Sequence, residues 1–94
     1  ELNPKYAKAY CNRGYLFKQD GDKEKALKDY NKAIELDAKF ARAYKNRGIL
    51  YFNSGALKKA RADFNKFLKL APRHRGASQI RAMIGKIKKQ LRGP

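Results

Sequence analysis

The 94-residue chain has no tryptophan, only one cysteine and only one histidine. Cys11 alone cannot form a disulfide within the chain, which excludes a small fold held together by cystines. A structural zinc ion takes four ligands, and only Cys11 and His74 are available, so we expect no metal site and no cofactor. Long apolar runs are also missing, since residues 49–52 are among the longest. We therefore expect no membrane insertion, with the cytoplasm as the default location.

Acidic side chains are scarce as well. The chain has 24 Lys and Arg against 8 Asp and Glu, for a formal net charge of +16. The last acid is Asp63, so every charged side chain after it is basic. Such an excess favours an acidic partner, which can be an acidic peptide or protein, a nucleic acid or an anionic lipid.

The chain is built from an internal repeat of 34 residues. Residues 1–40 aligned with residues 35–74 give 17 identities in 40 pairs. The segment at residues 7–14 returns at residues 41–48 with only two differences, one of them a lysine replaced by arginine. Periods of 20–50 residues are typical of solenoids and other stacked arrays.

Apolar residues recur at intervals of three and four along five segments, which predicts five helices. The expected helices cover residues 4–19, 23–36, 38–53, 57–70 and 74–92. Short breaks with a glycine at residues 20–22 and 54–55 predict antiparallel helical hairpins. The last helix has an apolar face and a basic face, which predicts a cap on the stack. Docking of its basic face on a membrane or a nucleic acid is the alternative.

The 34-residue period and its ladder of small and large residues resemble the tetratricopeptide repeat. The ladder consists of Tyr10, Gly14, Phe17, Ala26, Tyr30 and Ala33, followed by Tyr44, Gly48, Tyr51, Ala60, Phe64 and Phe67. The resemblance implies an all-α fold, an α-solenoid of stacked antiparallel helix-turn-helix hairpins. It divides the chain into the remnant of a preceding repeat (residues 1–6), two full repeats (7–40 and 41–74) and a basic capping helix (75–94).

Two positions depart from the ladder. The family pattern expects a small residue where Phe67 stands, and Ser78 of the cap stands where the repeats have Tyr10 and Tyr44. We therefore expect a size exchange, in which the Phe67 ring fills the space that Ser78 leaves.

The resemblance places the first helix of each repeat on the concave inner face of the solenoid. Helical spacing then directs ten side chains toward that face. They are Lys8, Cys11, Asn12, Tyr15 and Lys18 of the first repeat, and Arg42, Lys45, Asn46, Ile49 and Phe52 of the second. Cations pair with carboxylates, and amides hydrogen-bond the backbone of an extended peptide. We expect a protein–protein interaction scaffold that binds an acidic peptide or protein in this basic groove.

Some members of the family clamp the carboxylate of a chaperone's acidic C-terminal tail, using an asparagine and cations of the next repeat. Asn12 and Arg42 are of suitable types, but Asn46 stands where a clamp arginine is wanted. If Asn46 is taken as the clamp asparagine, Gly76 and Ile80 occupy the cationic places. The sequence therefore predicts an incomplete clamp.

The sequence offers little for catalysis. Ser54 lies in a turn and His74 in a basic connection, so no nucleophile–base pair is expected, and Cys11 is expected to pack or to line the groove. Asp20 and Asp22 suit turn and N-cap positions better than a metal site. We expect a protein that is not an enzyme.

Two other functions stay open. One is binding of RNA or another nucleic acid through the basic surface, with Tyr15 or Phe52 stacking on bases. The other is self-association of an excised or engineered repeat module. Residues 1–4 match the end of a second helix, so we expect that a hairpin preceded them. Its loss would expose Tyr6, Tyr10 and Phe17 and favour a homo-oligomer through the first helix.

Overall fold

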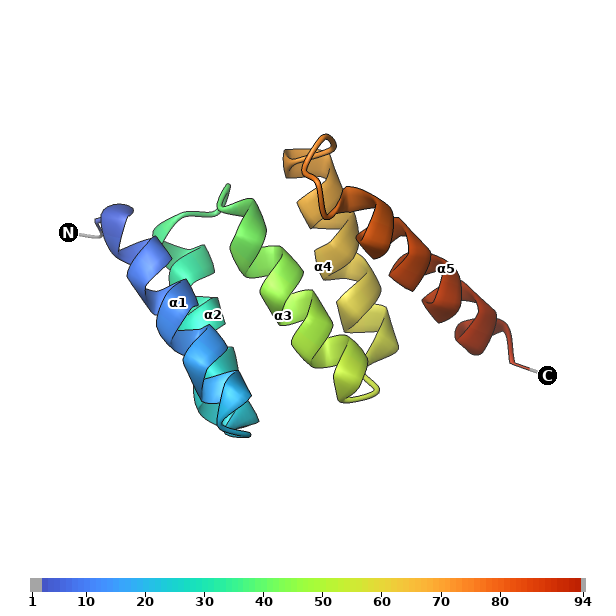
Figure 1. The fold of residues 1–94 in the computed structure, drawn as a ribbon, viewed down its shortest axis with the longest axis horizontal. Helices are drawn as coiled ribbons and strands as arrows, with labels where there is room; N and C mark the ends of the chain where they lie inside the picture. Colours follow the sequence, from blue (N-terminus) through green and yellow to red (C-terminus); the bar gives the residue numbers. More distant parts are fainter. Residues whose placement is uncertain (1–2, 94) are drawn as a thin grey trace.

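The structure, a computed structural model, describes residues 3–93, and the helices in this part of the chain follow one another without a strand (Figure 1). They are α1 (Lys5–Gln19), α2 (Lys23–Leu36), α3 (Ala41–Asn53), α4 (Leu57–Leu70) and α5 (Ala77–Arg92). The predicted all-α fold with five helices is confirmed. The expected remnant at residues 1–6 starts with Glu1 and Leu2, which lie outside the described residues.

Two helices begin later than expected because the preceding residues form turns. Asp37 accepts a hydrogen bond from the backbone N–H of Lys39 through its side chain, over 3.0 Å, and Phe40 is extended, so α3 starts at Ala41. The Nδ1 atom of His74 accepts from the N–H of Gly76 over 2.9 Å, so α5 starts at Ala77. In both cases a side chain competes with the helix for backbone hydrogen bonds.

The helices form two antiparallel hairpins, α1 with α2 and α3 with α4, and α5 packs on α4 (Figure 1). Helix α3 also contacts both helices of the first hairpin, and this places α1 at one end of the row and α5 at the other. The assembly is an elongated solenoid of 48 × 29 × 21 Å. Gly21 and Gly55 close the hairpins with backbone φ angles of +83° and +81°, which favour glycine. Asp22 caps α2 as expected, because its side chain accepts from the N–H of Lys25.

Glycines of the ladder allow the two helices of each hairpin to approach closely. A Cβ atom on Gly48 would lie 2.6 Å from the Cε1 atom of Phe64, and one on Gly14 would lie 2.8 Å from the Cε1 atom of Tyr30. Both rings are fully buried, so neither can move aside. The benefit of this contact outweighs the helix-propensity cost of about 1 kcal/mol for each glycine.

The core consists of two clusters, one between α1, α2 and α3, and the other between α3, α4 and α5. Phe67 is fully buried in the second cluster, and its ring meets the His74 ring edge to face at 5.3 Å. Ser78 is exposed. The size exchange between Phe67 and Ser78 stays a prediction, tested below by substitution.

A candidate peptide-binding groove

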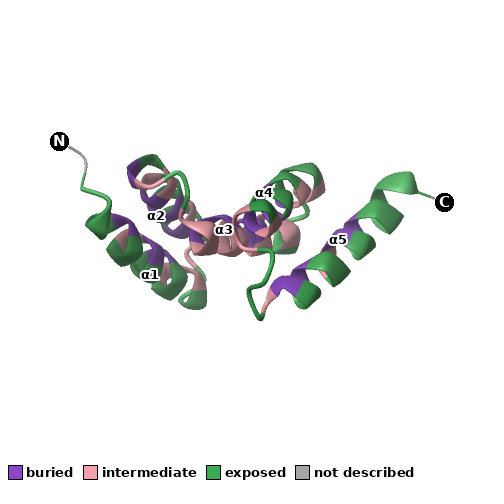
Figure 2. Cartoon of the chain, turned by 90° about the horizontal axis from the view of Figure 1, so that it is seen from above, coloured by how far each residue is buried: buried purple, intermediate pink, exposed green. Residues whose placement is uncertain are grey.

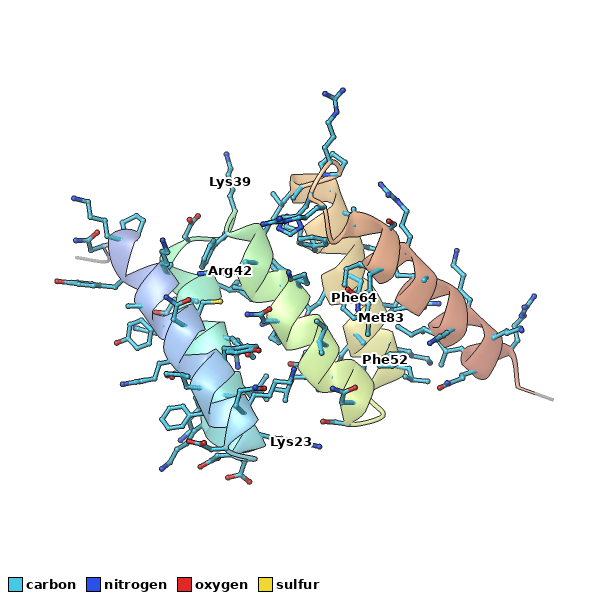
Figure 3. The ribbon with its side chains drawn as sticks, in the orientation of Figure 1. Lys23, Lys39, Arg42, Phe52, Phe64 and Met83 are labelled. Atoms are coloured by element: carbon cyan, nitrogen blue, oxygen red, sulfur yellow. The ribbon has the colours of Figure 1, made fainter. Side chains whose placement is uncertain are left out.

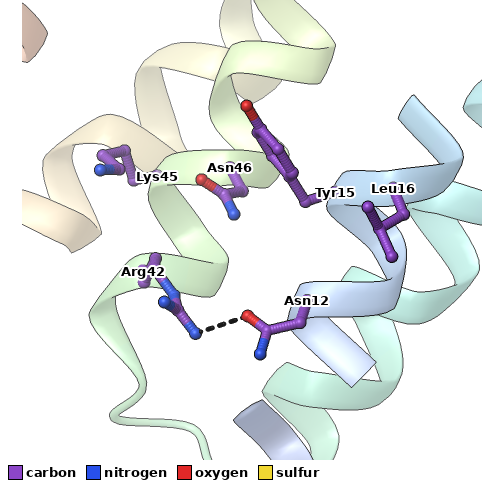
Figure 4. A pocket seen from close by; sticks show the side chains of 6 residues that line it. All are labelled: Asn12, Tyr15, Leu16, Arg42, Lys45 and Asn46. Atoms are coloured by element: carbon purple, nitrogen blue, oxygen red, sulfur yellow. Dashed lines mark hydrogen bonds between the residues drawn. The ribbon is translucent and has the colours of Figure 1, made fainter. Parts of the chain in front are cut away.

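A groove of about 430 Å³ runs between α1 and α3, the first helices of the two hairpins. Its walls are Asn12, Tyr15 and Leu16 of α1, and Arg42, Lys45 and Asn46 of α3 (Figure 4). Successive hairpins lie side by side in the solenoid, so side chains 30 residues apart in the chain face one another across this gap. The fold thus brings together five of the ten residues predicted for the concave face.

Polar contacts fix the geometry of the groove. The Nη2 atom of Arg42 donates to Oδ1 of Asn12 over 3.0 Å and so joins the two repeats (Figure 4). The Nδ2 atom of Asn46 donates to the Sγ atom of Cys11 over 3.5 Å. The guanidinium of Arg42 also lies 5.3 Å from the centre of the Phe40 ring. These contacts hold the Arg42 guanidinium and the Asn46 amide in defined positions at the groove wall.

Lys45 supplies the second charge of the lining. Burial lowers the pKa of Lys45, and the positive charge of Arg42 lowers it further. Its Nζ atom lies 5.8 Å from the centre of the Phe67 ring. The lining contains these two cations and no carboxylate, so a ligand carboxylate between them would relieve their repulsion.

The other five predicted residues do not line this groove. Lys8 lies one turn before Asn12, toward the start of α1, and Lys18 lies one turn after Tyr15, near its end. Cys11 is fully buried, so it packs beneath the groove and cannot touch a ligand there.

Ile49 and Phe52 are half-buried and pack against the second core cluster. Figure 3 shows Phe52 on the side of α3 that faces α4 and α5. Met83 of α5 packs against the same cluster. Helical spacing placed both side chains on the inner face, but it contained no information about how closely the neighbouring helices approach.

Sequence reasoning missed Leu16 as a groove residue. Its side chain is 61% exposed, although its repeat counterpart Leu50 is only 4% exposed. The helical spacing alone would have predicted Leu16 as a groove residue, because it follows Asn12 by four residues and lies on the same side of the helix. The repeat suggested the opposite, since a leucine at the same place in both repeats is typical of a core position.

Cys11 should be unreactive in the native protein. Burial raises the pKa of its thiol, against the opposing effect of the Arg42 charge. We expect no reaction with a thiol-specific chromogenic disulfide at pH 8, and full reaction after unfolding in urea. Because the unfolded thiol ionises first, the native state should lose stability as the pH rises past about 8.5. Rapid labelling of the native protein would contradict the buried position.

Two further findings limit the chemistry. Among residues 3–93, no group of three or more His, Cys, Asp or Glu side chains could hold a metal ion. No described helix has the length and apolar character needed to cross a membrane.

The family of the chain follows from its sequence model and from its structural neighbour. The tetratricopeptide repeat model matches residues 22–85. The chain belongs to the tetratricopeptide repeat (TPR) family. No curated protein matches the sequence. Among solved structures, the second TPR domain of the human RPAP3 protein, determined by NMR in complex with the HSP70 peptide SGPTIEEVD, matches with a TM-score of 0.75. It is 31% identical, and the match covers 93% of this chain and 68% of that one.

These matches confirm both the predicted family and the predicted solenoid of stacked TPR hairpins. They also support a role in protein–protein interaction, since the matched RPAP3 domain is itself bound to a peptide.

Proposed function

We propose that this TPR chain binds an acidic, extended segment of a partner protein in the groove between α1 and α3. Two repeats, residues 7–40 and 41–74, each contribute their first helix to it. The observation that carries the proposal is the lining, which holds Arg42 and Lys45 with no carboxylate. The peptide on the RPAP3 domain supports it, because two of its nine residues are glutamates and one is an aspartate.

The groove has a distinct task for each type of side chain. Arg42 and Lys45 pair with carboxylates of the ligand. Asn12 accepts from Arg42 through Oδ1, so its Nδ2 is oriented to donate to a peptide carbonyl. Asn46 donates to Cys11 through Nδ2, so its Oδ1 is left to accept from a peptide N–H. Tyr15 and Leu16 offer apolar contact area to the side chains between the acids.

Asn46 stands where a full carboxylate clamp would have an arginine, which removes one cation from the site. Two cations on α3 can pair with acidic side chains inside a segment as well as with a chain terminus. We therefore propose that acidic side chains contribute more to the affinity than a free C-terminal carboxylate does.

We propose binding without catalysis. The Oγ atom of Ser54 donates to the carbonyl of Leu50 over 2.8 Å, and Nδ1 of His74 accepts from Gly76. The whole of α4 separates Ser54 from His74, a distance of about 20 Å for 14 residues. A hydroxyl nucleophile and an imidazole base so far apart cannot act together.

The groove is tested by reversing its two charges. Arg42→Glu with Lys45→Glu should weaken binding of the peptide SGPTIEEVD by at least about tenfold, because two charge-assisted contacts become repulsive. The dissociation constant is measured by isothermal titration calorimetry at physiological salt. Peptides with the acids replaced by their amides, and a peptide with an amidated C-terminus, separate side-chain recognition from terminus recognition.

Lys58→Glu with Lys59→Glu is the matched control, since both lysines are exposed on α4 and the net charge changes by the same amount. It should leave the affinity nearly unchanged. Equal losses in the two double variants would show that only the overall charge attracts the peptide. Tighter binding of a single-stranded oligoribonucleotide than of the peptide at physiological salt would favour RNA as the partner.

A further inference from the structure

A second hollow, of about 530 Å³, lies between the start of α4 and the end of α5. Arg61 of α4 lines one side, and Gly85, Lys88, Leu91 and Arg92 of α5 line the other. The two helices run in opposite directions, so the first turns of α4 face the last turns of α5 (Figure 1). These last turns of α5 are exposed, which leaves the hollow accessible to a ligand (Figure 2).

The corresponding hollow between α2 and α3 carries no net charge, because its lining has one lysine and one glutamate. Three of its other lining residues are matched 34 positions later by residues of the second hollow, namely Leu27 by Arg61, Tyr51 by Gly85 and Ser54 by Lys88. These exchanges remove an aliphatic side chain and a ring and add two positive charges. The charge therefore belongs to this hollow and not to the repeat.

The side chains of α4 and α5 supply no carboxylate to neutralise these cations. Asp63 is the only acid of α4, and it is buried and receives two hydrogen bonds from Arg47. Helix α5 has no acid. Within residues 3–93, Arg61, Lys88 and Arg92 take part in none of the ion pairs. An anion that enters the hollow meets three positive charges that this part of the chain does not pair.

Arg61 is the half-buried member of the three cations. Four other arginines donate hydrogen bonds to acceptors of the chain, and they are Arg13, Arg42, Arg47 and Arg81. Arg61 has no such acceptor within the described range, and none of its nitrogen atoms is enclosed. Partial burial removes water from a guanidinium, so an acceptor oxygen supplied by a ligand stabilises it strongly.

We infer that this hollow is a binding site for a phosphate group, carried by a phosphorylated serine or threonine of a partner protein. A phosphomonoester has nearly two negative charges at pH 7 and three acceptor oxygens. Arg61 and Arg92 each donate parallel hydrogen bonds to these oxygens, and the Lys88 ammonium adds a third charge. Leu91, which is 37% exposed, contacts the residue beside the phosphorylated one.

Two other polyanions fit the hollow less well. A single-stranded nucleic acid stacks its bases on aromatic rings, and the lining has none, since Gly85 stands where the repeat has Tyr51. An anionic membrane requires apolar side chains that insert, and Ile80, Ile84 and Ile87 of α5 are buried in the core. A phosphorylated protein segment meets neither obstacle. The site is also separate from the groove between α1 and α3, so neither proposal depends on the other.

The probe is a capped peptide of sequence Gly-Gly-phosphoserine-Leu-Gly-Gly, and the same peptide without the phosphate is its reference. At physiological salt, the phosphopeptide should shift the amide signals of residues 57–62 and 85–92 in the ¹⁵N-labelled chain, and the reference should not. Arg61→Leu with Lys88→Ser should weaken this binding by at least about tenfold. The two substitutions introduce the residues that the repeat has at Leu27 and Ser54, so the circular dichroism spectrum should be unchanged.

Lys28→Gln with Lys69→Gln is the control, because both lysines are exposed outside the hollow and the net charge falls by the same amount. This chain should bind the phosphopeptide as the unchanged chain does. Equal affinities of the two double variants would overturn the inference. Equal affinities for the phosphopeptide and its reference, or shifts confined to residues 12–16 and 42–46 of the groove, would overturn it as well.

Three further probes distinguish other sources of the phosphate group. They are inorganic phosphate, a short RNA duplex and phosphatidylserine vesicles. Each should bind the unchanged chain and the Arg61→Leu, Lys88→Ser chain with similar affinity, or more weakly than the phosphopeptide does. If one of them binds more tightly than the phosphopeptide and loses this binding in the double variant, the site belongs to that ligand and not to a phosphorylated protein.

Discussion

Phe67→Ala should lower the free energy of unfolding by about 3–5 kcal/mol, the usual cost of emptying a fully buried aromatic site. Phe67 has no exposed surface and stands in the cluster that joins α3, α4 and α5. Its ring also supports the His74 ring and lies beneath the Lys45 ammonium. Urea unfolding followed by circular dichroism measures the change. We expect α5 to loosen first, because it lies at the end of the solenoid.

The size exchange with the cap predicts a partial rescue. Adding Ser78→Tyr to Phe67→Ala gives these two positions the residues that stand 34 residues earlier in the repeat, Tyr44 and Ala33. The double variant should be more stable than Phe67→Ala. Ser78→Tyr alone should not increase the stability, because on this prediction the Phe67 ring already fills the space that the tyrosine would occupy. Additive effects of the two substitutions would refute the exchange.

Asp63→Ala should cost about 2–3 kcal/mol of unfolding free energy. Asp63 is buried and receives two hydrogen bonds from Arg47, whose side chain is 21% exposed. Removing one partner of a buried ion pair costs about 3–5 kcal/mol, and the residual hydration of Arg47 reduces this figure. Arg47 would also lose the geometry with which it contacts Asn31 of the first hairpin, so the two repeats should unfold less cooperatively.

Asp29→Ala is the matched comparison, because Asp29 pairs with Arg13 through the same two hydrogen bonds. Arg13 is 59% exposed, so water can solvate its charge after the carboxylate is removed. The loss should therefore be smaller than for Asp63→Ala. Equal losses in the two variants would show that exposure of the arginine does not control the cost.

The proposed groove takes one of its walls from α1 and the other from α3. Asn12, Tyr15 and Leu16 of α1 line the groove. Because Arg42 joins α3 to Asn12, the spacing of the first two repeats sets the width of the groove.

The sequence by itself determined the repeat, the helices and the hairpins. The period of 34 residues and the intervals of three and four between apolar residues can be read directly from the order of residues. They predict helices and hairpins without any knowledge of which helices pack together. The ladder placed Gly14 and Gly48 in the first helices, where a Cβ atom would clash with Tyr30 and Phe64. The two positive charges of the groove, those of Arg42 and Lys45, were also predicted from the sequence.

The tertiary structure alone decided which of the inward-pointing residues are accessible. Helical spacing gives the direction of a side chain but not the distance to the next helix. Cys11 is fully buried and contacts Asn46 of α3, while Phe52 is half-buried and packs against the second core cluster. Leu16 and Leu50 occupy the same place in the repeat, yet one is exposed and the other is buried. The difference in exposure depends on which helix lies beside each leucine. Because the two leucines are identical and occupy the same place in the repeat, the repeat pattern alone could not predict it.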